Sequence, residues 1–339
     1  MLRMAALLPR HGLDTELWVL DPEGPLAVSV APGIPVTVLG TGRLREGVAA
    51  LARQVRRSRP ELMFSSFGHV TAALAGILAP LRKRPRLVAR EPNLPSLSMA
   101  GGGINRWLRL ACRLAYPRCD LMVASSERMA AELVNDYGVR RPRLMVLPNP
   151  VNETRIRERA RHRPAAPPCG RLFVAAGRLV PQKGFDRLID LWPRTRADDV
   201  LVLLGDGPER DRLRDAAFRA GVGERVLLQG YDSNPWGWYA LADAFLLPSR
   251  FEGMPNAALE ALACGTPVIA TPEAGGLVEL VPQLPARALT IRPADRLLEA
   301  ILRVPHTRAA APAPSLLPPR FRAAAVAAAL AHRLTTLLP

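Results

Sequence analysis

Short apolar segments alternate with helical patterns along almost the whole chain, and this rhythm constrains the fold more than any other feature of the sequence. Parallel strands joined by helices produce such a rhythm, so we expect an α/β protein with parallel sheets. The strands are expected near residues 17–20, 35–39, 62–66, 86–90, 121–125 and 144–148, and then near 171–177, 200–205, 225–230, 244–249 and 267–271.

The rhythm lapses between residues 152 and 170, where NETRIRERARHRPAAPPCG carries arginines and prolines without an apolar period. A length of 339 residues also favours two domains over one. We therefore expect a Rossmann-like domain over 1–151, a linker over 152–170 and a second Rossmann-like domain over 171–315. A helix is expected over 316–339, and its pattern does not say which domain it joins.

The charge of the chain is concentrated in its N-terminal half. The net charge is +16, and residues 1–170 hold 26 Lys and Arg against 13 Asp and Glu. Such a surface suits an anionic membrane, a phosphorylated acceptor or nucleic acid, and charge alone does not choose among them. Nothing in the sequence resembles a recognition helix, an RRM or a zinc module, so nucleic-acid binding is not expected.

Targeting and cysteine patterns indicate a cytoplasmic protein. The four cysteines form no CxxC pair, so we expect reduced thiols and no metal site. No signal peptide and no window of about 18 apolar residues is found, so any membrane attachment is expected to be peripheral. The cluster Arg82, Lys83, Arg84 and Arg86 follows an apolar stretch and is a candidate for contact with an anionic membrane, although a solvated helix end has the same pattern.

Residues around two motifs in the C-terminal half indicate a phosphate site. After the strand AFLLPS, the sequence FEGMPNAALEALACGTPV places two glutamates, Glu252 and Glu260, around the expected start of a helix that runs to about Cys264. The backbone at the amino end of this helix would point at an anion such as a diphosphate. That backbone belongs to Gly253, Met254, Pro255 and Asn256. Upstream, VAAGRLVPQKG puts Arg178 and Lys183 on either side of a turn, where they would add positive charge.

These motifs resemble those of the retaining GT-B glycosyltransferases of glycosyltransferase family 4, also called glycosyl transferases group 1. The family's E-x7-E motif matches here, as do EGMPN and ALACGTPVIAT, and GRLVPQKG corresponds to the family's G-R-x5-K-G motif with four residues between Arg178 and Lys183. The resemblance implies two Rossmann-like domains with parallel sheets that face each other across a cleft. It also implies a UDP-sugar or GDP-sugar donor, no cofactor, and Arg178 and Lys183 on the donor diphosphate in place of a metal ion. Glu252 would contact the sugar ring as a catalytic residue, and Glu260 would bind the ribose hydroxyls.

In the N-terminal half, His69 follows the strand LMFSS, where family members often place a histidine that meets the transferred sugar. We expect His69 to be catalytic, although a lone histidine is more often structural. The stretch AREPNLPS resembles an acceptor-side motif of polysaccharide glycosyltransferases.

The start of the chain departs from the family. LRMAALLPRHGLDTELWVL matches the family's first helix and second strand, so the resemblance predicts that the central first strand and its glycine loop are missing. Two interpretations stay open, a gene start placed too far downstream and a degraded, inactive copy.

The sequence thus predicts a retaining transferase that moves a hexose from a nucleoside diphosphate-sugar to a glycan or lipid-linked acceptor in envelope or exopolysaccharide synthesis. In the mechanism usually proposed for the family, the leaving diphosphate accepts the acceptor's proton. The main alternative is a truncated relic or a nucleotide-sugar-binding protein without transfer activity, and a sugar epimerase of the same fold is a further one.

Overall fold

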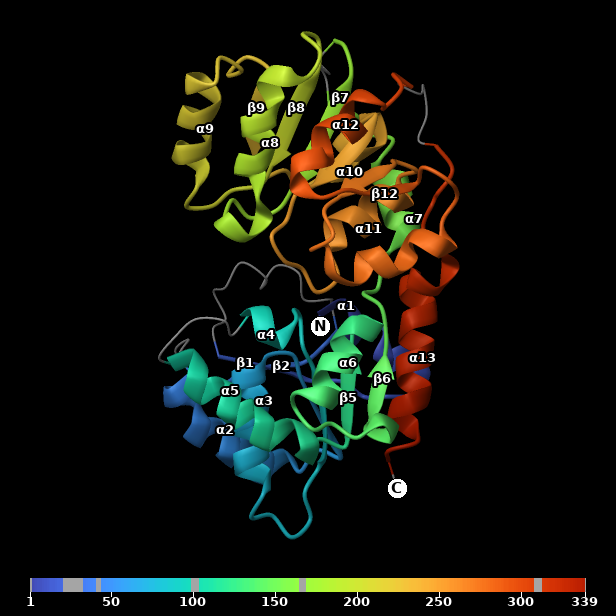
Figure 1. Ribbon diagram of the computed structural model, residues 1–339. Coiled ribbons are helices and arrows are strands. Elements are labelled where there is room, and N and C mark those ends of the chain that lie inside the picture. Colours follow the sequence, from blue (N-terminus) through green and yellow to red (C-terminus); the bar gives the residue numbers. More distant parts are fainter. Residues whose placement is uncertain are drawn as a thin grey trace. The chain divides into compact units, whose positions relative to one another are not determined.

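The computed structural model describes residues 2–20, 33–40, 44–98, 104–164, 169–307 and 313–338. The chain divides into two compact units (Figure 1). The first unit comprises Met1–Pro150 and Arg320–Pro339, and the second comprises Val151–Pro319. The last helix of the chain therefore belongs to the first unit, which the sequence pattern had left open.

All described strands of the first unit pair in parallel. Four of them form one sheet in the order β3-β4-β5-β6, and the other two form a separate sheet, β1-β2. Their bounds are β1 (Leu17–Val19), β2 (Val36–Val38), β3 (Leu62–Ser65), β4 (Arg86–Arg90), β5 (Leu121–Ala124) and β6 (Leu144–Val146).

The second unit holds one parallel sheet in the order β12-β11-β10-β7-β8-β9. Its strands are β7 (Leu172–Ala176), β8 (Val200–Leu204), β9 (Val226–Gly230), β10 (Ala244–Leu247), β11 (Val268–Ala270) and β12 (Leu289–Ile291). The α/β class and the two Rossmann-like domains are confirmed, and each expected strand is present. The strand β12 was not predicted.

Helices connect the strands in both units. The first unit contains α1 (Leu2–Ala5), α2 (Leu44–Ser58), α3 (Gly68–Leu78), α4 (Pro95–Ser98), α5 (Ile104–Ala115), α6 (Glu127–Asn135) and α13 (Ala323–Thr335). The second contains α7 (Glu153–Arg159), α8 (Phe185–Leu191), α9 (Arg210–Arg219), α10 (Pro235–Leu241), α11 (Asn256–Ala263) and α12 (Leu297–Leu302). No described helix is both long enough and apolar enough to cross a membrane.

Apolar clusters cover both faces of the sheet β3-β4-β5-β6. Successive residues of a strand point to opposite faces, so neighbours in one strand pack in different clusters. In β4, Leu87 packs with Leu74 and Met122 in one apolar cluster. Its neighbour Val88 packs with Leu121 and with Leu330 of α13 in a second cluster. The Ala- and Leu-rich helix α13 thus covers one face of this sheet, as Figure 1 shows.

Part of the expected linker is helical. Asn152 caps α7, with its side-chain Oδ1 accepting from the Arg155 backbone N–H at 3.1 Å. Ile156 is buried, so this short helix is anchored by packing as well as by its cap.

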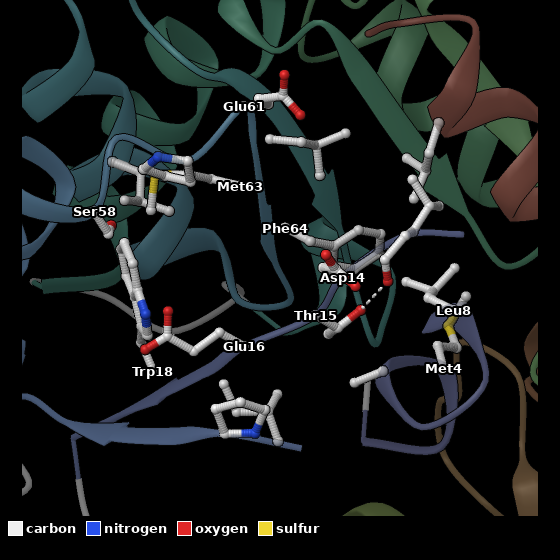
Figure 2. Close-up of a pocket in the computed structure, with 18 of the residues that line it drawn as sticks. Met4, Leu8, Asp14, Thr15, Glu16, Trp18, Ser58, Glu61, Met63 and Phe64 are labelled. Carbon is white, nitrogen blue, oxygen red and sulfur yellow. Dashed lines mark hydrogen bonds between the residues drawn. The ribbon is translucent and has the colours of Figure 1, made fainter. Parts of the chain in front are cut away.

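A cavity of about 740 Å³ lies in the first unit, between the two-stranded sheet and β3 (Figure 2). It is lined by residues of β1 and β3, by the helical segment ahead of β1 and by α13. The sequence had suggested that a central strand is missing from this domain.

Candidate functional site

Glu252 lies in the loop after β10 and is 5% exposed. Lys183 Nζ donates to Glu252 Oε1 at 2.6 Å, and Ser249 Oγ donates to the same oxygen at 2.8 Å. The Glu252 backbone N–H also donates to the Glu273 carbonyl oxygen at 3.0 Å. A buried carboxyl group is costly without hydrogen-bond donors, and the side chains of Lys183 and Ser249 supply two that fix the position of Glu252.

The loop that carries Lys183 is bound to the loop that carries Glu252. The Arg250 backbone N–H donates to the Gln182 carbonyl oxygen at 2.7 Å, and Gln182 Nε2 donates to the Phe251 carbonyl oxygen at 2.9 Å. The Arg250 guanidinium also pairs with both oxygens of Asp186, at 2.8 and 2.6 Å. Its hydrogen bonds lower the pKa of Asp186. The separation of Lys183 and Glu252 is therefore set by the backbone around them.

Two glycines allow neighbouring loops to approach the loop that carries Glu252 closely. Gly184 has a φ of +66°, and a Cβ there would lie 2.2 Å from the Pro248 carbonyl oxygen. Gly275 has a φ of +63°, and a Cβ there would lie 2.3 Å from the Glu252 carbonyl oxygen. Side chains are excluded at both positions by contact and by conformation.

The helix α11 begins at Asn256 and ends at Ala263, close to the predicted bounds. Gly253, Met254 and Pro255 are buried directly ahead of it, and Asn256 is exposed. Pro255 stands at its N-cap position and makes no side-chain cap hydrogen bond. The first N–H groups of a helix have no partner within the helix, so this end favours an anion.

Glu260 lies within α11 and is only 7% exposed. The indole Nε1 of Trp236, in α10, donates to Glu260 Oε2 at 2.9 Å. A carboxylate with one oxygen held by a neutral donor is oriented and still has acceptor capacity.

Arg178 follows β7 and is exposed. Within the described part of the chain its side chain makes no hydrogen bond or ion pair. Arg178, Lys183, Glu252, Gly253 to Asn256, and Glu260 all belong to the second unit. The structure thus gathers the predicted donor-side residues in one unit.

Sequence reasoning missed three contributors to this site. Ser249 ends the strand motif AFLLPS and could have been noticed because it stands three residues before Glu252. Trp236 and Glu273 gave no signal, because their contacts with Glu260 and Glu252 join segments distant in the sequence.

His69 belongs to the first unit and lies in the first turn of α3, directly after β3. It is exposed and stacks on Phe67 with ring centroids 5.6 Å apart. Partial burial of the imidazole lowers its pKa.

Arg90 and Glu91 of the AREPNLPS stretch are buried inside the first unit. Arg90 Nη2 donates to Asn149 Oδ1 at 2.5 Å, and Tyr116 Oη donates to Glu91 Oε1 at 2.7 Å. Burial raises the pKa of Glu91 to about 7, although the Tyr116 hydrogen bond opposes this shift.

Half of the basic cluster at residues 82–86 is bound to Asp120. Arg84 Nη1 lies 2.7 Å from Asp120 Oδ2, and Arg86 Nη1 lies 3.4 Å from Oδ1. Burial alone would raise the pKa of Asp120, but hydrogen bonds from Arg84 and the Leu87 N–H outweigh it and lower the pKa. Arg84 and Arg86 thus have a structural role that their spacing did not reveal.

Comparisons with known proteins agree with the site. Residues 1–155 match the family model Glycosyltransferase Family 4, and residues 156–311 match the model Glycosyl transferases group 1. The 2-deoxystreptamine N-acetyl-D-glucosaminyltransferase of Streptomyces fradiae is 31% identical over 317 residues, 84% of this chain and 73% of that protein.

Other curated relatives match over shorter stretches. One is the N-acetylgalactosamine-N,N'-diacetylbacillosaminyl-diphospho-undecaprenol 4-alpha-N-acetylgalactosaminyltransferase of Campylobacter jejuni, 30% identical over 58% of this chain and 54% of its own length. Another is the lipopolysaccharide core biosynthesis glycosyltransferase LpsE of Rhizobium meliloti, 34% identical over 48% of this chain and 47% of its own length. The chain thus spans about half the length of these two relatives.

Solved structures share the fold at low sequence identity. Anabaena Alr3699/HepE in complex with UDP has a TM-score of 0.71 at 18% identity, over 98% of this chain and 92% of its own. Sucrose-phosphate synthase from Thermosynechococcus elongatus has a TM-score of 0.76 at 19% identity, over 99% of this chain and 88% of its own. With two family models that together cover most of its length, a relative aligned over most of both chains and the GT-B fold, this chain belongs to the family 4 (group 1) glycosyltransferases.

Proposed function

We propose that the chain is a retaining hexosyltransferase that uses a UDP-sugar or GDP-sugar and acts on a lipid-linked glycan in envelope or exopolysaccharide synthesis. The observation that carries this proposal is the buried Glu252, held at 2.6 Å by Lys183 in the loop that leads into the amino end of α11. The buried carboxylate can stabilise a positive charge on a substrate, and the cation and the helix amino end can stabilise a negative charge on it.

The donor diphosphate would bind between Lys183, Arg178 and the amino end of α11. The guanidinium of Arg178 is exposed and has no side-chain partner among the described residues, and the Lys183 ammonium needs only to share its existing contact with Glu252. Glu260 would accept from the ribose hydroxyls while Trp236 holds its other oxygen.

Glu252 would act on the sugar. As the bond between the anomeric carbon and the diphosphate oxygen breaks, positive charge develops on the sugar ring, and a fixed carboxylate stabilises it. Lys183 and Arg178 stabilise the negative charge of the leaving diphosphate. The acceptor hydroxyl forms the new bond on the same face and gives its proton to the diphosphate oxygen that leaves, so no protein base is required.

Names of similar proteins support the choice of substrates. A further structure of Alr3699/HepE contains UDP-glucose, and the Campylobacter relative is named for a diphospho-undecaprenol substrate. We extend both features, a UDP-sugar donor and a lipid-linked acceptor, to this chain as part of the proposal. The protein would then work in the cytoplasm at the membrane surface, where Arg82 and Lys83 could contribute charge.

Donor binding is tested by thermal stabilisation with UDP-, GDP- and ADP-sugars, because a ligand that binds only the native state raises its melting temperature. Lys183→Ala should weaken the stabilisation, and Glu252→Gln should retain it while losing transfer. Arg219→Ala, an exposed change on α9, is the matched control and should behave as wild type.

The stereochemistry is tested separately. An NMR assignment of the anomeric configuration in the product should show the configuration of the donor. Inversion would refute the retaining mechanism, and wild-type transfer by Glu252→Gln would refute the role of Glu252.

A second candidate function is nucleotide-sugar binding without transfer. The cavity of about 740 Å³ in the first unit favours it, because an incompletely packed acceptor-side domain could not position an acceptor. Calorimetric binding of UDP or GDP with no turnover of any donor in the presence of glycan acceptors would support this alternative.

A further inference from the structure

The helix α5 presents large apolar side chains on the surface of the first unit. Trp107, Leu110 and Leu114 are 64%, 47% and 56% exposed. Their spacing of three and four residues puts them on one face of the helix. The other side of α5 is anchored, because Cys112 and Ala115 are buried in the core of the unit and α5 packs beside α3 (Figure 1). The fold therefore holds this apolar row in place at the surface.

Such a row is unusual within this chain. Among the described helices, α5 is the one with three large apolar side chains that are this exposed. The two most exposed ones of the second unit stand apart from each other, Phe218 in α9 and Tyr231 after β9. Single exposed apolar residues are common, whereas a contiguous apolar patch beside polar residues marks a contact surface.

A row of arginines runs beside the apolar row. Each of the three exposed apolar residues of α5 is preceded by an arginine, and these are Arg106, Arg109 and Arg113. The two rows therefore run in parallel, about 100° apart around the helix. The Arg106 guanidinium lies 5.5 Å from the Trp107 ring centroid, and Arg118 adds an exposed cation just after the helix. The sequence of α5 contains no acidic residue.

Contacts with the neighbouring helix do not cancel this charge. Arg113 Nε donates to the Asp136 carbonyl oxygen at 3.1 Å, and Arg118 Nη1 donates to the Leu114 carbonyl oxygen. Both acceptors are neutral backbone groups. Asp136 is itself exposed and adds one negative charge beside the four arginines. The surface around α5 is therefore both apolar and positive.

We infer that α5 is the main contact of the first unit with an anionic membrane, rather than the basic cluster at residues 82–86. The interface of an anionic bilayer takes up tryptophan and leucine side chains and offers negative headgroups to arginines. The helix has 12 residues and is about 18 Å long. It is too short to span a bilayer and lies flat in the interface.

The basic cluster is less suited to this contact. Arg84 and Arg86 are bound to Asp120. Residues 82–86 include no large apolar side chain, and Leu81 ahead of them is half-buried. Arg82 and Lys83 can therefore add charge to a bound protein, but they do not provide an apolar anchor.

A second copy of the chain fits the α5 surface less well than a membrane does. In a two-fold dimer the same patch meets itself, so the arginine rows of both copies would lie close together. With no acidic residue on α5 to pair with them, these like charges would oppose association. The inference makes the proposed membrane location specific, but it is measured without donor or acceptor, so its failure and a failure of transfer are distinguishable.

Vesicle flotation tests the apolar row with phosphatidylcholine vesicles that contain or lack phosphatidylglycerol. Wild type should float with the anionic vesicles, and less at raised salt. The triple variant Trp107→Ser, Leu110→Ser, Leu114→Ser should partition onto them at least about tenfold more weakly. The control Phe218→Ser, Tyr231→Ser removes side chains that are 81% and 83% exposed from the second unit and should float as wild type.

The arginine row is tested with Arg106→Gln, Arg113→Gln. One arginine near an anionic surface contributes about fivefold to partitioning, so this double variant should bind about 25-fold more weakly. The matched control Arg82→Gln, Lys83→Gln removes the same charge from exposed residues of the basic cluster. Its partitioning should fall by less than about threefold, because these side chains lie outside the main contact.

Tryptophan fluorescence locates the contact on the helix. Trp107 is the most exposed of the five tryptophans, and Trp192, Trp236 and Trp238 are buried. Anionic vesicles with brominated acyl chains should quench the wild-type emission. Trp107→Phe keeps the apolar row, so this variant should still float but should lose most of the quenching.

Three results would overturn the inference. The first is unchanged flotation of the triple variant, and the second is an equal loss of binding in the two charge variants. The third is a wild-type protein that binds no vesicle and changes from dimer to monomer in the triple variant, as measured by analytical ultracentrifugation. If the triple variant does not fold, the quenching of wild type against Trp107→Phe still decides whether α5 enters the bilayer.

Discussion

At the scale of single residues, the buried carboxylates Glu252 and Glu260 have different partners. Lys183 gives Glu252 a cation, whereas Trp236 gives Glu260 a neutral donor. Buried ion pairs contribute little net stability compared with apolar residues of similar size, so stability alone does not account for charged groups here. The arrangement is better suited to binding and charge stabilisation than to packing.

Lys183→Met tests the first of these contacts. Removing the cation leaves the Glu252 carboxylate with Ser249 as its side-chain donor, so we expect the free energy of unfolding to fall by about 1–3 kcal/mol. Transfer should fall by more than about 100-fold, since charge stabilisation at a reacting centre contributes several kcal/mol. A double-mutant cycle with Glu252→Gln, followed by chemical unfolding and by transfer assays, separates the two effects. Additive losses of stability would show that the 2.6 Å contact has no energetic role.

Trp236→Phe tests the second contact and keeps most of the aromatic packing. The substitution removes the N–H that holds Glu260 Oε2, so we expect nucleotide affinity to weaken about 3- to 10-fold, the value of one hydrogen bond. Calorimetry with UDP and GDP measures this change. Wild-type affinity would show that Trp236 does not orient Glu260.

Glu91 predicts a pH effect on stability. Burial raises its pKa from 4.5 to about 7, so the folded protein keeps a proton that the unfolded chain releases. The stabilisation from this proton is complete below about pH 4.5 and is lost as the pH rises to about 7. Glu91→Gln mimics the protonated form and does not titrate. As the pH rises from about 4.5 to about 7, the free energy of unfolding of this variant should therefore increase relative to that of wild type by up to about 3 kcal/mol. Urea unfolding at a series of pH values checks this, and parallel curves for the two proteins would contradict it.

At the scale of elements, the loops that follow β7, β10 and β11 form the site together. Gly275 lies against the Glu252 carbonyl oxygen, and the Gly276 N–H donates to the Gly253 carbonyl oxygen at 2.8 Å. The loop after β11 therefore positions the loop that carries the catalytic candidate.

Gly275→Ala should move this loop. The new Cβ would meet the Glu252 carbonyl at 2.3 Å, whereas Gly221→Ala, at a similar φ of +68°, meets nothing within 4 Å. Both variants share the conformational cost of about 1 kcal/mol, and only Gly275→Ala adds a clash. We expect Gly275→Ala to lose most transfer activity while Gly221→Ala retains it, as measured by initial rates and thermal unfolding. Equal activity in both variants would contradict the positioning role.

At the scale of the whole molecule, the chain returns to its first unit through α13. Val326 and Leu330 pack with Val88 and Leu121 of the sheet. The end of the chain is thus needed for the core of the unit that contains its beginning.

Leu330→Ala should destabilise the first unit by about 2–3 kcal/mol, at the low end for a buried leucine because its side chain already borders the cavity. Donor-induced stabilisation of the second unit should persist. Hydrogen exchange resolved by segment measures both effects, with the partly exposed Leu302→Ala as control. If Leu330→Ala speeds hydrogen exchange only in the second unit, Leu330 does not belong to the core of the first unit.

Several features could be predicted because their signal is local. Apolar runs such as 200–205 and 244–249 located strands, and Pro255 with Asn256 located the start of α11. The strand β12 was missed because Leu289–Ile291 is short and only its first residue is buried. The contacts of Trp236, Gly275 and Asp120 join distant segments, so no local pattern could reveal them.

The sequence by itself determined the parallel α/β class, the two-domain division and the residues of the donor-side motifs, because periodicity and motif spacing are properties of neighbouring residues. Only the tertiary structure decided that α13 belongs to the first unit, that Lys183 lies 2.6 Å from Glu252 and that Arg84 and Arg86 bind Asp120. It also placed a cavity beside β3. The physical reason is that pairing and packing depend on which distant segments meet, and chain folding alone brings them together.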